Sequence, residues 1–173
     1  MRSRTITLNI VYFVVFFLFQ ILIFRNAVLF NYSFCFIYIG AILLLPFETP
    51  HLLLMAAAFV LGFTVDIFYD TMGIHMAASV FMAYMRPYIV NFLTPKGGYD
   101  LSTEVTIHSL GIQWFLSYAG ILVVIHHFAL FVLESWGINV FFRLLAKTIF
   151  SSIFTLLVLT LFQYLFHSPR RYK

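Results

Sequence analysis

The chain has 173 residues, of which 63% are hydrophobic and only 9% are charged, with a formal net charge of +4. A soluble domain carries about 25% charged residues, so this chain cannot cover a water-facing surface. Its single cysteine, Cys35, excludes a disulfide within the chain. The composition therefore predicts an integral membrane protein with one domain.

Six apolar stretches approach the ~20 residues that a membrane-spanning helix needs. We expect spans at about 5–24, 28–45, 51–69, 73–92, 112–133 and 148–166. A polar loop follows the fourth span at about 94–109. A separate interfacial lead-in helix is expected at about 138–147, where Arg143 and Lys147 are spaced i,i+4. The predicted fold is an all-α bundle of six transmembrane helices.

The distribution of basic residues predicts the orientation. An even number of spans puts both chain ends on one side, with Arg2, Arg4, Arg86, Lys96, Arg170, Arg171 and Lys173. The other side carries only Arg25, Arg143 and Lys147. Because Lys and Arg are enriched on the cytoplasmic side, both termini and the loop at 94–109 are expected in the cytoplasm.

The turn between the third and fourth spans concentrates ionisable residues in apolar sequence, where a charge is costly and normally faces the bundle interior. Asp66 and Asp70 are spaced i,i+4 and share a helix face, and Gly73 and His75 begin the next span. Since the first N–H groups of a helix favour an anion, the expected partner of Asp66 is His75 or that open N-terminus. A ligand or proton role, or contact with a partner's helix, are the alternatives.

Arg86 lies about 16 Å further along the fourth span than His75, at 1.5 Å per residue. It is therefore expected at the cytoplasmic rim, with Glu48 as its candidate partner. Pro87 follows it and lacks a backbone N–H, so the fourth span is expected to kink there.

Small residues indicate where helices approach closely. Ala58 and Gly62 form a small-xxx-small pair on the third span, and Ala119 and Gly120 mark the fifth. We therefore expect spans three, four and five to be the inner helices. The first span is bulky, with Gln20 as its one polar group at mid-depth, and is expected at the periphery.

Two further groups could suggest chemistry. His126 and His127 are adjacent, so they point about 100° apart on a helix, and no nearby cysteine or acid completes a metal-ligand set. A structural or partner-binding pair is the favoured reading. Ser151, Ser152 and Thr155 are expected to bond back to preceding carbonyls, as is usual in membrane helices. We expect no metal, cofactor, nucleic-acid partner or enzymatic activity.

The run from Gly62 to Asp66, the turn with Gly73 and His75, and the small-residue helix with Tyr84 are similar to the core of the MreD family of six-span rod-shape-determining proteins. The length, the basic N-terminus and the scarcity of polar loops resemble that family too. The segments RPYIVNFLTPKGGYDL and VVIHHFALFVLE resemble its Bacteroidota-type variant. Residue by residue, only Gly62, Asp66 and Gly73 match the family pattern.

The resemblance implies a non-enzymatic scaffold of the bacterial inner membrane, within the elongation machinery that makes lateral peptidoglycan and maintains cell shape. Its partners would be an MreC-like bitopic protein and, in a larger complex, a RodA-type glycan polymerase with its transpeptidase. The partner helix would pack on the first or fifth span. The family's helical arrangement resembles the substrate-binding components of energy-coupling-factor transporters, so a vitamin or small-molecule transporter component is the alternative. Those components dock through small-residue motifs on the first helix, which this chain lacks.

Overall fold

The computed structural model describes residues 2–30, 32–99, 103–135 and 141–166, and most of them are helical. Within these ranges, three helices are long and apolar enough to cross a membrane: α3 (His51–Tyr69), α6 (Ile112–Glu134) and α7 (Phe141–Phe166). Two further long helices are α1 (Arg2–Leu22) and α4 (Ile74–Phe92). The bounds of α3, α4 and α6 agree closely with the predicted stretches at 51–69, 73–92 and 112–133.

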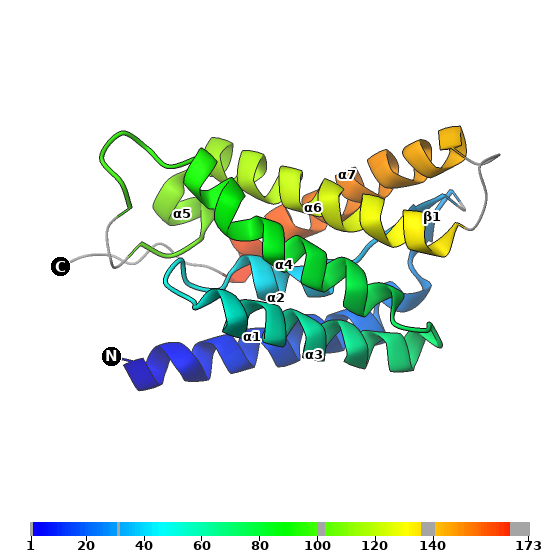
Figure 1. Cartoon of the computed structure of the whole chain (residues 1–173), viewed down its shortest axis with the longest axis horizontal. Helices are drawn as coiled ribbons and strands as arrows, with labels where there is room; N and C mark the ends of the chain where they lie inside the picture. Colours follow the sequence, from blue (N-terminus) through cyan, green and yellow to red (C-terminus); the bar gives the residue numbers. More distant parts are fainter. Residues whose placement is uncertain (1, 31, 100–102, 136–140, 167–173) are drawn as a thin grey trace.

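Successive long elements run back and forth along the long axis of the bundle (Figure 1). α3 packs against α4, α4 against α6, and α6 against α7, while α1 contacts α3 and residues 37–43. The start of α1 and the end of α7 lie at the same end of the bundle, opposite the turn that joins α3 to α4 (Figure 1).

Residues 28–45 do not form a long helix, so the predicted helical second span is wrong. They form a hairpin of β1 (Val28–Leu29) and β2 (Ser33–Phe34), then the 3₁₀ turn η2 (Ile37–Ile39) and the four-residue helix α2 (Gly40–Leu43). A further 3₁₀ turn, η1 (Phe24–Asn26), precedes the hairpin. Aromatic and β-branched residues, which favour extended backbone over helix, dominate this sequence.

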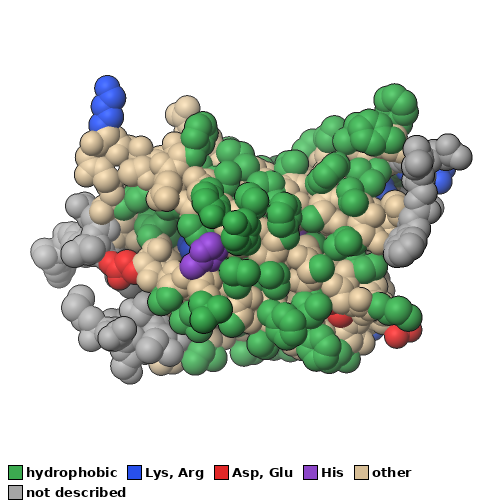
Figure 2. Space-filling model, in the orientation of Figure 1, with side chains coloured by type: hydrophobic (Ala, Val, Ile, Leu, Met, Phe, Trp, Pro, Cys, Tyr) green, Lys and Arg blue, Asp and Glu red, His purple; other side chains and the backbone are tan. Residues whose placement is uncertain are grey.

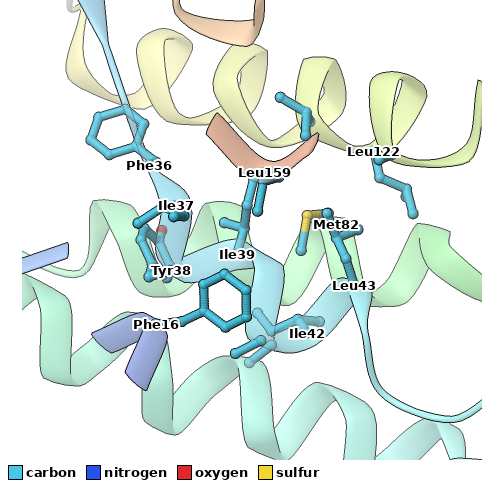
Figure 3. Close-up of a cluster of buried hydrophobic side chains, with 14 of the residues drawn as sticks. Phe16, Phe36, Ile37, Tyr38, Ile39, Ile42, Leu43, Met82, Leu122 and Leu159 are labelled. Atoms are coloured by element: carbon cyan, nitrogen blue, oxygen red, sulfur yellow. The ribbon is translucent and has the colours of Figure 1, made fainter. Parts of the chain in front are cut away.

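This irregular segment runs through the middle of the molecule. All residues from Cys35 to Leu43 are buried. Figure 3 shows side chains of residues 36–43 packed among Phe16 of α1, Met82 of α4, Leu122 of α6 and Leu159 of α7. A Cβ atom on Gly40 would lie 2.6 Å from side-chain atoms of both Leu159 and Phe16, so any other residue here would force these side chains of α7 and α1 to shift. Non-helical backbone at membrane depth is tolerated where protein buries it in this way.

α7 is one continuous helix from Phe141, so a separate lead-in helix at 138–147 is wrong for the residues that are described; 138–140 lie outside them. The side chain of Lys147 explains why the helix needs no break. Its Nζ bonds Glu134 at 3.0 Å and lies 4.8 Å from the ring centre of Phe131 and 5.0 Å from that of Phe34. These contacts stabilise the Lys147 ammonium group near the N-terminal end of α7.

The loop expected at 94–109 ends in a short helix, α5 (Ile107–Leu110), which Thr106 caps by accepting a hydrogen bond from Ser109 N. Val105 and Ile107 are buried, so this end of the loop belongs to the core.

The outer surface of the bundle is apolar. Figure 2 shows hydrophobic side chains over the middle of one face, with the charged side chains gathered mostly toward the two ends of the long axis. Exposed large hydrophobic residues occur on all five long helices.

Candidate functional site

The carboxylate of Asp66 caps α4, as the sequence predicts. Asp66 is only 3% exposed. One of its oxygens accepts hydrogen bonds from His75 N at 3.0 Å and from the Thr71 hydroxyl, and the other accepts one from Met76 N at 2.9 Å. The first N–H groups of α4 therefore compensate the buried negative charge.

Asp70 and Gly73 shape this turn without joining the cap. Asp70 is exposed, ends α3 in a left-handed conformation with φ 56°, and donates its backbone N–H to Asp66 O. Gly73 precedes α4 with φ 85°, a conformation that favours glycine. Their i,i+4 spacing predicted that Asp66 and Asp70 share a face of one helix. In the structure α3 ends between them, so Asp66 is helical and Asp70 is not. Thr71, which the sequence analysis did not single out, supplies the third donor.

The hydroxyl of Tyr38 joins three buried side chains from two helices. It lies 3.2 Å from His75 Nδ1, 3.1 Å from Ser79 Oγ and 2.8 Å from His126 Nε2. Tyr38 belongs to the irregular segment, so this junction connects residues 33–45 to both α4 and α6. Sequence reasoning missed Tyr38 because it expected this residue inside a helix.

His127 continues the network on the other side of the segment. Its ring bonds Val123 O at 2.8 Å and Thr155 Oγ1 at 3.1 Å, and Thr155 also accepts from Phe36 N at 3.1 Å. His126 and His127 are fully buried, so neither can contact a partner helix on the outer surface. Among the described residues, no three His, Cys, Asp or Glu side chains are placed to hold a metal ion.

Polar side chains from α1 and α7 replace the helical hydrogen bonds that residues 33–38 lack. Gln20 accepts from Tyr38 N at 3.3 Å and donates to Cys35 O at 3.1 Å, and Ser151 Oγ accepts from Phe34 N at 2.9 Å. Ser151 and Thr155 therefore bond across to this segment, not back along their own helix as expected. Gln20 places one face of α1 in the core.

Arg86 holds the other end of the irregular segment. It is 2% exposed. Its Nε donates to Tyr118 Oη at 2.6 Å, and its Nη2 donates to Leu45 O and, at 3.4 Å, to Leu43 O. The Tyr118 hydroxyl donates to Leu43 O at 2.9 Å. These carbonyls lie at and just beyond the C-terminal end of α2, where backbone oxygens are free and favour a cation.

The predicted pairing of Arg86 with Glu48 is wrong, because the guanidinium turns inward to these oxygens. An ion pair lies elsewhere, between Lys147 and Glu134. α4 continues through Pro87 to Phe92, and the kink expected at Pro87 stays a prediction.

Gly62 sets the distance between α3 and α4. A Cβ atom on it would lie 2.6 Å from Met76 Cα and 2.8 Å from His75 O, so the close approach predicted from the small residues is confirmed there. Ala58 and Ala119 are fully buried. Gly120 is different, since a Cβ on it would make only ordinary contact, 3.8 Å from Leu156.

These contacts form one system, which we call the interior lock: Gln20, Tyr38, Asp66, His75, Ser79, Arg86, Tyr118, His126, His127, Ser151 and Thr155. Its members hold the irregular segment and the start of α4 in place.

A scan of protein-family models gives no match to the chain, and comparisons with curated proteins and with solved structures give none either.

Proposed function

We propose that this chain is a non-catalytic scaffold of the bacterial inner membrane, of the MreD type, with both termini in the cytoplasm. It would hold an MreC-type bitopic protein within the elongation machinery that builds lateral peptidoglycan. The observation that carries the proposal is how the polar residues are used. The charged and polar side chains of the interior lock bind the chain's own backbone and one another, and the outer faces of the long helices present apolar side chains.

This division of roles favours a scaffold over a small-molecule carrier. A ligand at Asp66 would have to displace three hydrogen bonds, and one at Arg86 would have to displace two carbonyls and a tyrosine hydroxyl. The hollow that Phe16, Gly40 and Gln163 help to line has no room for a water molecule.

The outward stripe of α1 is the surface that we assign to the partner helix. Val11, Val14, Leu18 and Leu22 are exposed at i, i+3, i+7 and i+11, which places them on one side of the helix. α6 packs between α4 and α7, whereas α1 lies at the edge of the bundle, where it contacts α3, the irregular segment and, through Phe16 and Phe19, the last turns of α7. A single partner helix can therefore lie along α1. Helix association in lipid relies on such packing and on interhelical hydrogen bonds.

The class is tested by purifying the tagged protein from native membranes in mild detergent and identifying co-purifying proteins by mass spectrometry. The proposal predicts an MreC-like protein, with or without the glycan polymerase and its transpeptidase. An ATPase module with a coupling membrane subunit would instead establish the transporter alternative. Recovery of neither set would contradict both.

The face is tested with Val14→Asn, and Ile153→Asn on α7 is its matched control. The two side chains are about equally exposed, at 50% and 52%. Val14→Asn should release the MreC-like protein while the folded chain is still recovered in wild-type amount, and Ile153→Asn should retain it. Equal retention by both variants would show that the partner binds elsewhere.

A further inference from the structure

The tip of the β1–β2 hairpin combines an unfavourable backbone conformation with an unfavourable exposure. A hydrogen bond from Tyr32 N to Leu29 O closes the turn, and Phe30 within it has φ 54°. Asn or Gly would adopt this left-handed conformation easily, whereas a bulky aromatic residue is a clear outlier there. The Phe30 side chain is also 93% exposed. A strained residue that its surroundings maintain is a sign of function.

The surroundings of Phe30 extend the apolar surface of the helices. Leu22 and Ile23 at the end of α1 are exposed, and the exposed Val28 and Leu29 of β1 continue that surface to Phe30. The hairpin lies at the end of the bundle that carries the α3–α4 turn, and it is not stacked on the middle of the helices (Figure 1).

Amphipathic and cationic groups lie beside this apolar tip. Arg25 is exposed, with its Cζ 6.0 Å from the ring centre of Tyr69, and Tyr32 is exposed in the hairpin itself. Aromatic residues gather at the depth of lipid headgroups, and an arginine there can contact the phosphates. An apolar tip, amphipathic rings and a nearby cation are the features that match the border between headgroups and acyl chains.

We propose that the β1–β2 hairpin is a membrane-interface anchor, in which Phe30 inserts past the headgroups to the start of the acyl chains in the leaflet at this end of the bundle and Arg25 faces lipid phosphate. The anchor ties the irregular segment to the bilayer, because β2 leads directly into residues 35–43. This inference rests on the membrane location proposed above and not on the MreD-type partners.

The depth of the hairpin is measured by spin labelling in proteoliposomes of phosphatidylethanolamine and phosphatidylglycerol. Cys35, which is buried, is first replaced by alanine so that each protein carries one label. Labels are placed at Leu29→Cys, beside an intact Phe30, at Leu157→Cys on the exposed face of α7, and at Lys96→Cys in the loop after α4. Electron paramagnetic resonance then compares the accessibility of each label to oxygen and to a water-soluble nickel complex.

Oxygen should exceed the nickel complex at positions 29 and 157, and the nickel complex should exceed oxygen at position 96. A water-like value at 29 with a lipid-like value at 157 would overturn the anchor alone. A water-like value at 157 would overturn the membrane location itself. Spin–spin broadening at position 29 would show that a second copy of the chain covers the tip, which also overturns the proposal.

A second set of variants tests whether the Phe30 ring is the anchor. The label stays at Leu29→Cys, and Phe30→Asn is compared with Phe30→Trp. Asparagine suits the left-handed turn but removes the ring, so the label should shift toward water while the thermal stability in detergent is kept. Tryptophan should keep the label at its lipid-like depth. The same depth in both variants would contradict the role assigned to Phe30.

Discussion

The molecule buries two charges near opposite ends of the α3–α4 pair, and it compensates both with backbone and not with an opposite charge. Asp66 accepts from the first N–H groups of α4, and Arg86 donates to carbonyls at the C-terminal end of α2. Asp66 therefore meets the start of a long helix, whose dipole favours an anion. Arg86 meets carbonyl oxygens that the single turn of α2 leaves unpaired. In an apolar bundle, a helix end serves as a counter-charge without a second ionised side chain.

The two sites differ in what could replace the charged group. Asp66 acts only as an acceptor, and a neutral amide keeps one acceptor oxygen. Arg86 acts through a rigid fork of donors that reaches two carbonyls and Tyr118 together, and no neutral side chain has that geometry. We therefore expect the site at Arg86 to be much less tolerant.

Arg86→Met should have the largest effect. It removes the donor to Leu45 O, the donor to Tyr118 Oη and one of the donors to Leu43 O, and each buried group left unsatisfied costs about 1–3 kcal/mol. The variant should fail to accumulate or should unfold far below the wild type in a thermal melt in detergent. Arg143→Met, at an exposed arginine of α7, is the control and should melt like the wild type. A wild-type melting temperature for Arg86→Met would contradict the claim that the Arg86 site is the less tolerant of the two.

Gly62→Ala should have the next largest effect, because it separates Asp66 from the helix end that compensates it. The new methyl group would lie 2.6 Å from Met76 Cα, so α4 must shift, and overpacking of this kind costs about 1–3 kcal/mol. Gly120→Ala is the matched control, with 3.8 Å to its nearest neighbour. The melting temperature should fall for Gly62→Ala only; an equal fall in both variants would count against the close approach.

Asp66→Ala removes the cap and should cost about 0.5–2 kcal/mol, the usual range for such a loss. Asp66→Asn should cost clearly less, because asparagine also caps well. Both values come from denaturant or thermal unfolding of the purified variants. If asparagine destabilises the protein as much as alanine does, the negative charge itself is needed and capping is an incomplete account.

Lys147→Met should have the smallest effect, although it breaks the ion pair with Glu134. The two side chains are 21% and 48% exposed, and an exposed pair contributes only about 0–1 kcal/mol. A thermal melt should move little, and added salt should reduce the difference further. A loss as large as that of Arg86→Met would show that the pair is a main support of the fold.

The same two sites show how far the sequence predicts the structure. The donors to Asp66 lie within ten residues along the chain, so the spacing of one turn was enough to find them. The carbonyl acceptors of Arg86 lie more than 40 residues away, and these carbonyls are free to accept only because residues 28–45 are not one long helix. Hydropathy predicts long apolar helices well. It cannot show that Gln20, Ser151 and Thr155 will form hydrogen bonds with the backbone groups of a segment that is not helical. Gly40 was missed for the same reason, because the residues that pack against it, Phe16 and Leu159, are far away in the sequence.

The central claim is that the buried charges stabilise the fold and that partners bind outside. The most direct test is the amount of MreC-like protein recovered per folded chain from cells that carry the wild type, Asp66→Asn or Asp66→Ala. The account predicts the same ratio in all three, with only the total amount of folded chain reduced for Asp66→Ala. A fully folded Asp66→Asn protein that has lost its partner would contradict it and would assign Asp66 a direct role in binding.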